Sequence, residues 1–171
     1  MSTSQQTAHA IEVQVGRRLL LLACTQTKRH ASGPMPALRR YDGPSFRVLR
    51  KWQSANPDEA ARLDILILSA KFGLITADAP ITDYDRRLTP ERADELGQAV
   101  SAGLTAFVTQ HGPYTATLVH LGKDYRPAIV LEQIQDPAFG HITFTSGGIG
   151  TRLGQLKRWL AATSEIILSN L

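Results

Sequence analysis

The segment at residues 19–28, LLLLACTQTK, constrains the fold more than any other part of this sequence. Four leucines and an alanine lead into Cys24, and the four residues after it are all polar. A short apolar run without polar alternation is typical of a strand buried on both faces, as in a parallel sheet. Ligands of open α/β sheets bind outside the carboxyl ends of such strands. We therefore expect Cys24, Thr25, Gln26 and Lys28 to line a binding site.

Two further apolar runs of strand length follow, LDILIL at residues 63–68 and TATLVHL at 115–121, and residues 142–144 are a fourth candidate strand. Helical segments are predicted between and after these strands, at residues 46–55, 90–110, 126–133 and 151–162. This alternation predicts an α/β fold, a three-layer sandwich with a mostly parallel central sheet of about four strands flanked by helices. Residues 29–44 and 74–88 are predicted as loops.

Two of the predicted helices have start signals. Thr89 precedes Pro90 and Glu91, which is the pattern of an N-cap, a proline at the first helical position and an acid in the first turn. Ser45 is predicted as the N-cap of the helix at 46–55.

The length of 171 residues indicates one domain, which we place at residues 16–171 after a loose tail or edge strand at 1–15. A formal charge of +4 favours an anionic partner mildly. The single cysteine excludes an internal disulfide framework and a zinc site of several cysteines, and a reduced cytoplasmic setting is the default. The histidines lack metal-ligand spacing. We expect no metal, no cofactor and no membrane contact, and the sequence indicates no protein partner.

The second and third strands also end in polar turns. Ser69 and Lys71 follow the second strand, where the lysine suits a phosphate and Phe72 suits stacking on a base, a contact that contributes roughly 1–3 kcal/mol. The same pattern also fits an ordinary turn with a surface lysine and a core phenylalanine. Asp124 and Tyr125 follow the third strand, where they are placed to bind a ligand edge or to begin the short helix.

The predicted loop at 74–88 carries the sequence Asp-Tyr-Asp-Arg-Arg, with Tyr84 between two acids. Cleavage of a glycosidic bond passes through an oxocarbenium-like state that a carboxylate stabilises. Asp85 is the candidate catalytic carboxylate on this ground. The alternative is a solvated charged loop with local ion pairs, which contribute little energy.

Cations and a glycine segment suggest contacts with a nucleic-acid backbone. Arg39, Arg40, Arg86 and Arg87 are predicted to surround the pocket, and Gly148 lies before the last helix, where backbone amides bind anions. The chain lacks a Walker motif and a dinucleotide fingerprint, which argues against a nucleotide triphosphatase.

Cys24 has two interpretations. A cysteine beside Lys28 on a strand-end turn is a candidate thiolate of lowered pKa. Free cysteine is also among the most buried residue types, so Cys24 fits the last buried residue of its strand better than a nucleophile.

Five segments in this order resemble a family of small bacterial and phage proteins. They are Cys24-Thr-Gln-Thr-Lys28, the segment from Tyr41 to Phe46, Leu68-Ser-Ala-Lys-Phe-Gly-Leu74, Tyr84-Asp85 with Leu88, and Gly122-Lys-Asp-Tyr125. The layout is more distantly similar to the core domain of archaeosine synthase, to peroxide-stress proteins that bind DNA, and to the uracil-DNA glycosylase type of fold. The resemblance implies a pocket for a base at the strand ends.

We therefore expect a base-processing enzyme on nucleic acid, DNA more than RNA, and specifically an N-glycosylase that removes a modified base in repair or in defence against phage. The alternatives are a non-catalytic nucleic-acid-binding stress protein and an enzyme on free nucleosides or nucleotides. With Asp85 as the catalytic group, the expected substrate contacts are Cys24, Thr25, Gln26, Lys28, Ser69, Lys71, Phe72, Tyr84, Asp124 and Tyr125.

Overall fold

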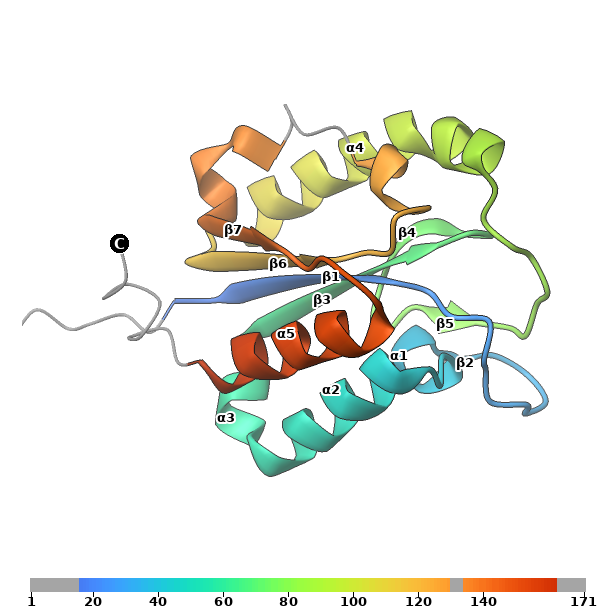
Figure 1. Ribbon diagram of the computed structural model, residues 1–171, viewed down its shortest axis with the longest axis horizontal. Coiled ribbons are helices and arrows are strands. Elements are labelled where there is room, and N and C mark those ends of the chain that lie inside the picture. Colours follow the sequence, from blue (N-terminus) through green and yellow to red (C-terminus); the bar gives the residue numbers. More distant parts are fainter. Residues whose placement is uncertain (1–15, 130–133, 163–171) are drawn as a thin grey trace, which may run out of the picture.

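The computed structural model describes residues 16–129 and 134–162 (Figure 1). The expected tail at 1–15 lies outside the described residues, as does half of the helix expected at 126–133. Among the described residues, no helix is both long and apolar enough to cross a membrane.

A five-stranded sheet forms the centre of the molecule, with the order β4-β3-β1-β6-β7. The strands are β1 (Arg18–Ala23), β3 (Leu63–Ser69), β4 (Gly73–Thr76), β6 (Ala116–His120) and β7 (His141–Phe144). β1 lies at the centre, parallel to β3 and β6, and β7 is parallel to β6, whereas β4 is antiparallel to β3. The mostly parallel α/β sheet is confirmed, with five strands rather than about four.

Helices cover both faces of the sheet. α4 (Pro90–His111) lies on one face, and α1 (Ala37–Arg40), α2 (Pro44–Ala55), α3 (Pro57–Ala60) and α5 (Ile149–Ala161) lie on the other (Figure 1). Two 3-10 turns, η1 (Arg126–Ala128) and η3 (Pro137–Phe139), lie between β6 and β7 in the chain. The segment expected as a helix at 126–133 therefore begins as a 3-10 turn.

The two faces of β1 contribute to two separate cores. Leu19 and Leu21 belong to the core under α4, and Leu20 and Leu22 belong to the core under α2 and α5. All four leucines are at most 2% exposed. Successive side chains of a strand point to opposite faces, so a strand between two helical layers requires the unbroken apolar run that the sequence shows.

Two segments expected as loops contain regular structure. The chain reverses after β3 at Gly73, whose φ of 74° is in the region that favours glycine, and β4 then pairs with β3 from Ser69↔Gly73 onward. β5 (Pro80–Ile81) pairs with β2 (Met35–Pro36). These strands have two to four residues, which is too short for a periodic signal in the sequence.

The predicted cap at Thr89 is confirmed, since its side chain accepts a hydrogen bond from the backbone amide of Arg92. The predicted cap at Ser45 is wrong, because α2 begins earlier, with Gly43 as its N-cap and Pro44 as its first residue. Ser45 lies inside the first turn, and its hydroxyl is bound to His120.

Candidate functional site

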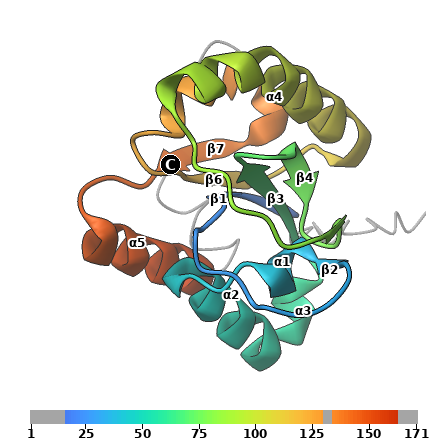
Figure 2. The same ribbon diagram turned by 90° about the vertical axis from the view of Figure 1, so that its right-hand side faces the viewer.

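The carboxyl ends of β1, β3 and β6 lie at one edge of the sheet, which Figure 2 views directly. The chain passes from β1 to β3 on one side and returns to β6 on the other, so this edge is a topological switch point, the usual ligand position in such sheets. The loop after β1 and the loop before α4 cross this edge together (Figure 2). The polar strand ends predicted from the sequence therefore come together.

Cys24 connects three of these strand ends. Its sulfur lies 2.9 Å from the hydroxyl of Tyr125, beyond β6, and accepts a hydrogen bond of 3.4 Å from the amide of Ala70, beyond β3. Its own amide donates to the carbonyl of Leu68. The cysteine is partly buried and reaches the pocket wall, so it serves both as a strand terminus and as a lining residue.

Three hydroxyl groups form a hydrogen-bonded cluster beneath this edge. Tyr41 donates to the Ser69 hydroxyl at 3.1 Å, and the Tyr84 hydroxyl lies 2.6 Å from that of Tyr41 and 2.9 Å from that of Ser69. Ser69 also accepts hydrogen bonds from the amides of Lys71 and Phe72. Ser69 thus fixes the turn after β3 and holds Tyr84 in the floor of the site.

Burial keeps the phenols of this edge neutral. It raises the pKa of Tyr41 to about 12 and also raises the pKa values of Tyr84 and Tyr125. Neutral phenols donate and accept hydrogen bonds but do not act as general bases at neutral pH. Asp85 and Asp124, both exposed, are the two carboxylates that line the pocket at this edge.

A pocket of about 280 Å³ lies over this cluster, and we call it the strand-end pocket. Its polar lining includes ten of the residues predicted from the sequence, namely Cys24, Thr25, Gln26, Lys28, Tyr84, Asp85, Arg86, Arg87, Asp124 and Tyr125. Leu88 completes the wall. The pocket therefore combines two carboxylates and three cations with neutral hydrogen-bonding groups.

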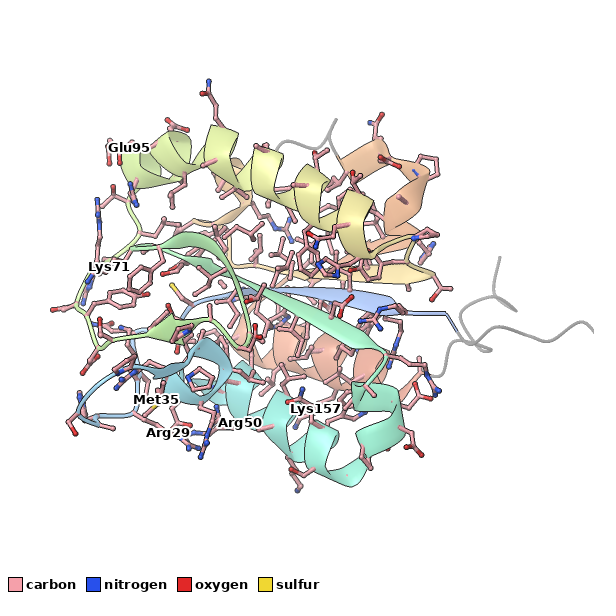
Figure 3. All side chains as sticks on the ribbon, turned by 180° about the vertical axis from the view of Figure 1, so that it is seen from behind. Arg29, Met35, Arg50, Lys71, Glu95 and Lys157 are labelled. Atoms are coloured by element: carbon pink, nitrogen blue, oxygen red, sulfur yellow. The ribbon has the colours of Figure 1, made fainter. Side chains whose placement is uncertain are left out.

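Two lysines lie near the Tyr84 ring. The Lys28 ammonium is 4.3 Å from the ring centroid and the Lys71 ammonium is 5.5 Å away. Figure 3 shows Lys71 at this edge of the molecule, on the side of Glu95. Phe72 packs edge-on against Tyr84 at 5.3 Å and is 38% exposed. The Lys71 ammonium also lies 5.1 Å from the Phe72 centroid, so a lysine approaches each ring, and Phe72 is the more exposed ring of the two.

A more open groove of about 480 Å³ adjoins the pocket, and we call it the His30 groove. His30 Nδ1 lies 3.0 Å from an Asp83 carboxylate oxygen, and this contact lowers the pKa of Asp83. Four residues line both the groove and the strand-end pocket, namely Gln26, Lys28, Tyr84 and Asp85. Asp85 therefore lies at the junction of the strand-end pocket and the groove.

Arg40 was predicted to contact a nucleic-acid backbone, and the structure contradicts this. Its side chain is 0% exposed, and its guanidinium donates to the carbonyls of Arg29 and Gly33 at 2.7 and 2.6 Å, with longer bonds to Ala31 and Ile81. A polar loop without regular hydrogen bonds needs donors for its carbonyls, and Arg40 supplies them. It supports the loop after β1 from inside.

Of the other predicted backbone contacts, Arg86 and Arg87 line the strand-end pocket, whereas Arg39 and Gly148 lie outside it. Arg39 is exposed on α1, outside the strand-end pocket. Gly148 is the N-cap of α5, beside a second pocket.

Sequence reasoning missed a second cluster beside the strand-end pocket. Ser45 Oγ lies 2.8 Å from His120 Nε2, and both residues line a cavity of about 240 Å³ with Arg152, which we call the Arg152 pocket. Burial, and secondarily the charge of Arg152, lower the pKa of His120 to about 4. His120 is the last residue of β6, so the rule that placed Asp124 at this edge also applies to it.

The Ser45–His120 contact has the geometry of a nucleophile and a base, but a catalytic histidine also needs a group that orients its other nitrogen. His120 Nδ1 is buried and has no hydrogen-bond partner among the described residues. The pair therefore lacks the third member of a triad. No group of three potential metal-ligating side chains occurs in residues 16–129 and 134–162.

No curated protein is similar enough to this chain to count as a match. A solved structure with a similar fold is that of AF0587, a protein of unknown function, with a TM-score of 0.50 and 16% sequence identity. The similarity covers 85% of this chain but only 45% of that chain, so this chain spans less than half of its length. Residues 19–161 match the profile of DUF6884, a family of unknown function, and the chain belongs to this family.

Proposed function

We propose that this protein is a base-processing enzyme on nucleic acid, a DNA N-glycosylase that removes a modified base. The observation that carries the proposal is the position of Asp85, a carboxylate at the junction of the strand-end pocket and the His30 groove. A base that has left the duplex stack needs a pocket to receive it, and the attached sugar stays at the mouth of that pocket. A carboxylate at the mouth is placed to act on the sugar.

The reaction is a hydrolysis. The bond between the sugar C1′ and the base nitrogen breaks, the water oxygen forms a bond to C1′, and a proton from the water passes to the departing base. Asp85 stabilises the positive charge that develops on the sugar and orients the water. Tyr125 and the Cys24 thiol are neutral or weakly polar groups for the base edge, and Phe72 offers a surface for stacking.

Cations around the same pocket favour a polymer with phosphates on both sides of the target base. Lys28, Arg86 and Arg87 line the strand-end pocket, and Lys71 lies beside Tyr84. The motif resemblance to proteins that act on or bind nucleic acids supports the same substrate class. Repair and defence against phage with modified DNA both require this reaction.

A base-release assay tests the proposal. Wild-type protein and the Asp85→Asn variant are incubated with genomic DNAs that carry different base modifications and with transfer RNA. Mass spectrometry measures free base, and alkali reveals abasic sites as strand breaks. We expect release by the wild type and a loss of at least about 100-fold in Asp85→Asn, in the range of acid–base contributions.

The matched control is Asp83→Asn, which changes an exposed carboxylate two residues away that lines the His30 groove but not the strand-end pocket. It should keep most of the activity. Release that survives in Asp85→Asn but is lost in Asp124→Asn moves the catalytic role to the second carboxylate. Binding without release from any substrate leaves a non-catalytic nucleic-acid-binding protein, and strong competition by mononucleosides indicates an enzyme on free nucleosides.

A further inference from the structure

Arg152 is the feature of the Arg152 pocket that the proposed reaction does not use. Its guanidinium makes no hydrogen bond or ion pair among the described residues, and its Nε is buried without a partner. The other described arginines that are fully or partly buried do have acceptors; these are Arg18, Arg40, Arg50, Arg62 and Arg92. An unpaired cation in a pocket wall lacks the partner that partly buried charges usually have.

The position of Arg152 in its helix is also unfavourable for a cation. It lies in the first turn of α5, where the helix dipole is positive, and this turn contains no acidic residue. At the end of β6, a Cβ on Gly122 would come within 3.3 Å of the guanidinium, so the absence of a side chain there leaves room for it. Local charge rules are broken most often at functional sites.

The rest of the pocket is suited to an anion. The first turn of α2, with Pro44 and Ser45, lines the same cavity, so two helix N-termini meet there, and the first turn of α2 also contains no acid. His120 is 7% exposed, and its Nδ1 has no partner among the described residues. Asp124 is the carboxylate of the pocket, and it is exposed at the border with the strand-end pocket.

The geometry points to a phosphate site: the Arg152 pocket binds a phosphate ester, with Arg152 as the charged anchor and the Ser45 hydroxyl as a donor. In this arrangement His120 Nε2–H donates to Ser45 Oγ, which leaves the single Ser45 proton for the phosphate. The two pockets share Cys24, Thr25, Asp124 and Tyr125, so a phosphate here is next to a base in the strand-end pocket. The site itself stands on its own groups. Its role as the seat of the phosphate beside the target nucleotide rests on the proposed function.

Calorimetric titration of the full-length protein tests the site with three probes: inorganic phosphate, a nucleoside 5′-monophosphate with its nucleoside as control, and a single-stranded oligonucleotide. The variants are Arg152→Gln and, as the matched control, Arg158→Gln, an exposed arginine of the same helix. We expect Arg152→Gln to bind the phosphate-bearing probes about tenfold or more weakly, as for a lost charge-assisted hydrogen bond, and Arg158→Gln to bind like the wild type.

Ser45→Ala provides a second variant that leaves the charge in place, and its phosphate affinity should fall severalfold. Urea unfolding checks that each variant is folded. The inference is overturned if the wild type binds the monophosphate no better than the nucleoside and also fails to bind inorganic phosphate. It is equally overturned if Arg152→Gln and Arg158→Gln bind phosphate alike.

The same titrations separate the two sources of a phosphate. Arg152-dependent binding of the oligonucleotide that the monophosphate does not displace supports a nucleic-acid backbone, and displacement supports a free nucleotide. The outcome of the base-release assay is independent of the outcome of the phosphate titrations. If no base is released but phosphate binding depends on Arg152, the site stands without the glycosylase. If base is released equally by Arg152→Gln, with unchanged KM, the glycosylase stands without the site.

Discussion

Arg40→Met distinguishes most sharply between the role predicted for Arg40 from the sequence, a contact with a nucleic-acid backbone, and its role in the structure, support of the loop after β1. Methionine keeps most of the length of the side chain but removes the guanidinium, which donates short bonds to the Arg29 and Gly33 carbonyls and longer ones to Ala31 and Ile81. A hydrogen bond from a charged group contributes about 1.5–3 kcal/mol, so the two short bonds amount to about 3–6 kcal/mol.

Part of this stabilisation is offset because folding buries the Arg40 charge completely, and its Nε has no partner among the described residues. Methionine avoids that penalty. We therefore expect the free energy of unfolding to fall by about 2–4 kcal/mol in Arg40→Met. Urea unfolding followed by tryptophan fluorescence measures it. Arg39→Met, at an exposed neighbouring position, is the control and should change stability by less than about 0.5 kcal/mol.

The loop that Arg40 supports also carries a pocket residue. Lys28 pairs with Tyr41 in an isolated bridge, and the amide of Arg29 donates to the carbonyl of Arg40. Loss of Arg40 should therefore weaken ligand binding through the position of Lys28. A loss of less than about 1 kcal/mol in stability, together with a DNA-binding salt slope reduced by about one, would refute this reasoning, because that is the behaviour of a direct phosphate contact.

Two further substitutions test the hydrogen-bonded groups behind the pockets. Because burial lowers the pKa of His120 to about 4, the folded protein binds this proton less readily than the unfolded chain, whose histidine titrates near 6.5. As pH drops from about 6.5 to about 4, the free energy of unfolding should fall by up to about 3 kcal/mol more in the wild type than in His120→Asn. Urea unfolding across this pH range measures the difference, with His111→Asn, at an exposed position, as the control. Equal pH dependence of stability in the wild type and His120→Asn would contradict the lowered pKa of His120. Tyr84→Phe removes a hydroxyl bound to Tyr41 and Ser69 but keeps the ring beside Lys28. We therefore expect the free energy of unfolding to fall by about 1–2 kcal/mol in the same assay, with little change in ligand affinity. A large loss of affinity would show that the hydroxyl contacts the ligand.

The layout of the sheet and much of the site could be predicted because both depend on short-range patterns. The leucine run of β1 is apolar on both faces because helices cover both, and the switch to polar residues at Cys24 marks where the strand leaves the core. Parallel strands end at a common edge, so the polar turns after β1 and β6 had to meet there. The loop that carries Asp85 was predicted to lie at the same edge because of the family resemblance and because of its charged residues.

Arg40 and Ser45 show what the sequence could not reveal. An arginine in a glycine- and proline-rich loop looks the same whether it faces solvent or inward, and its direction depends on carbonyls of residues 29–33 that are placed by tertiary structure. Ser45 follows Pro44 and resembles a cap, but Gly43 begins the helix, and the hydroxyl of Ser45 is free to bind His120. The partner lies 75 residues away, beyond any local signal.

Polar groups of the strand-end pocket are arranged by depth, and this arrangement favours one orientation of a ligand. Tyr41 and Ser69 are fully buried behind the pocket and hydrogen-bond to the Tyr84 hydroxyl, and the partly buried phenols of Tyr84 and Tyr125 form a neutral floor, whereas Asp85 and Arg86 are exposed at the mouth. A neutral, hydrogen-bonding group of a ligand can contact the floor without burying an unpaired charge, and a charged group of the ligand remains at the mouth. A nucleotide has these two parts, a neutral hydrogen-bonding base and a charged phosphate on the sugar. Substitutions at the mouth should consequently change affinity with a dependence on salt, whereas removal of the Tyr125 hydroxyl, in the floor, should change it at every salt concentration alike.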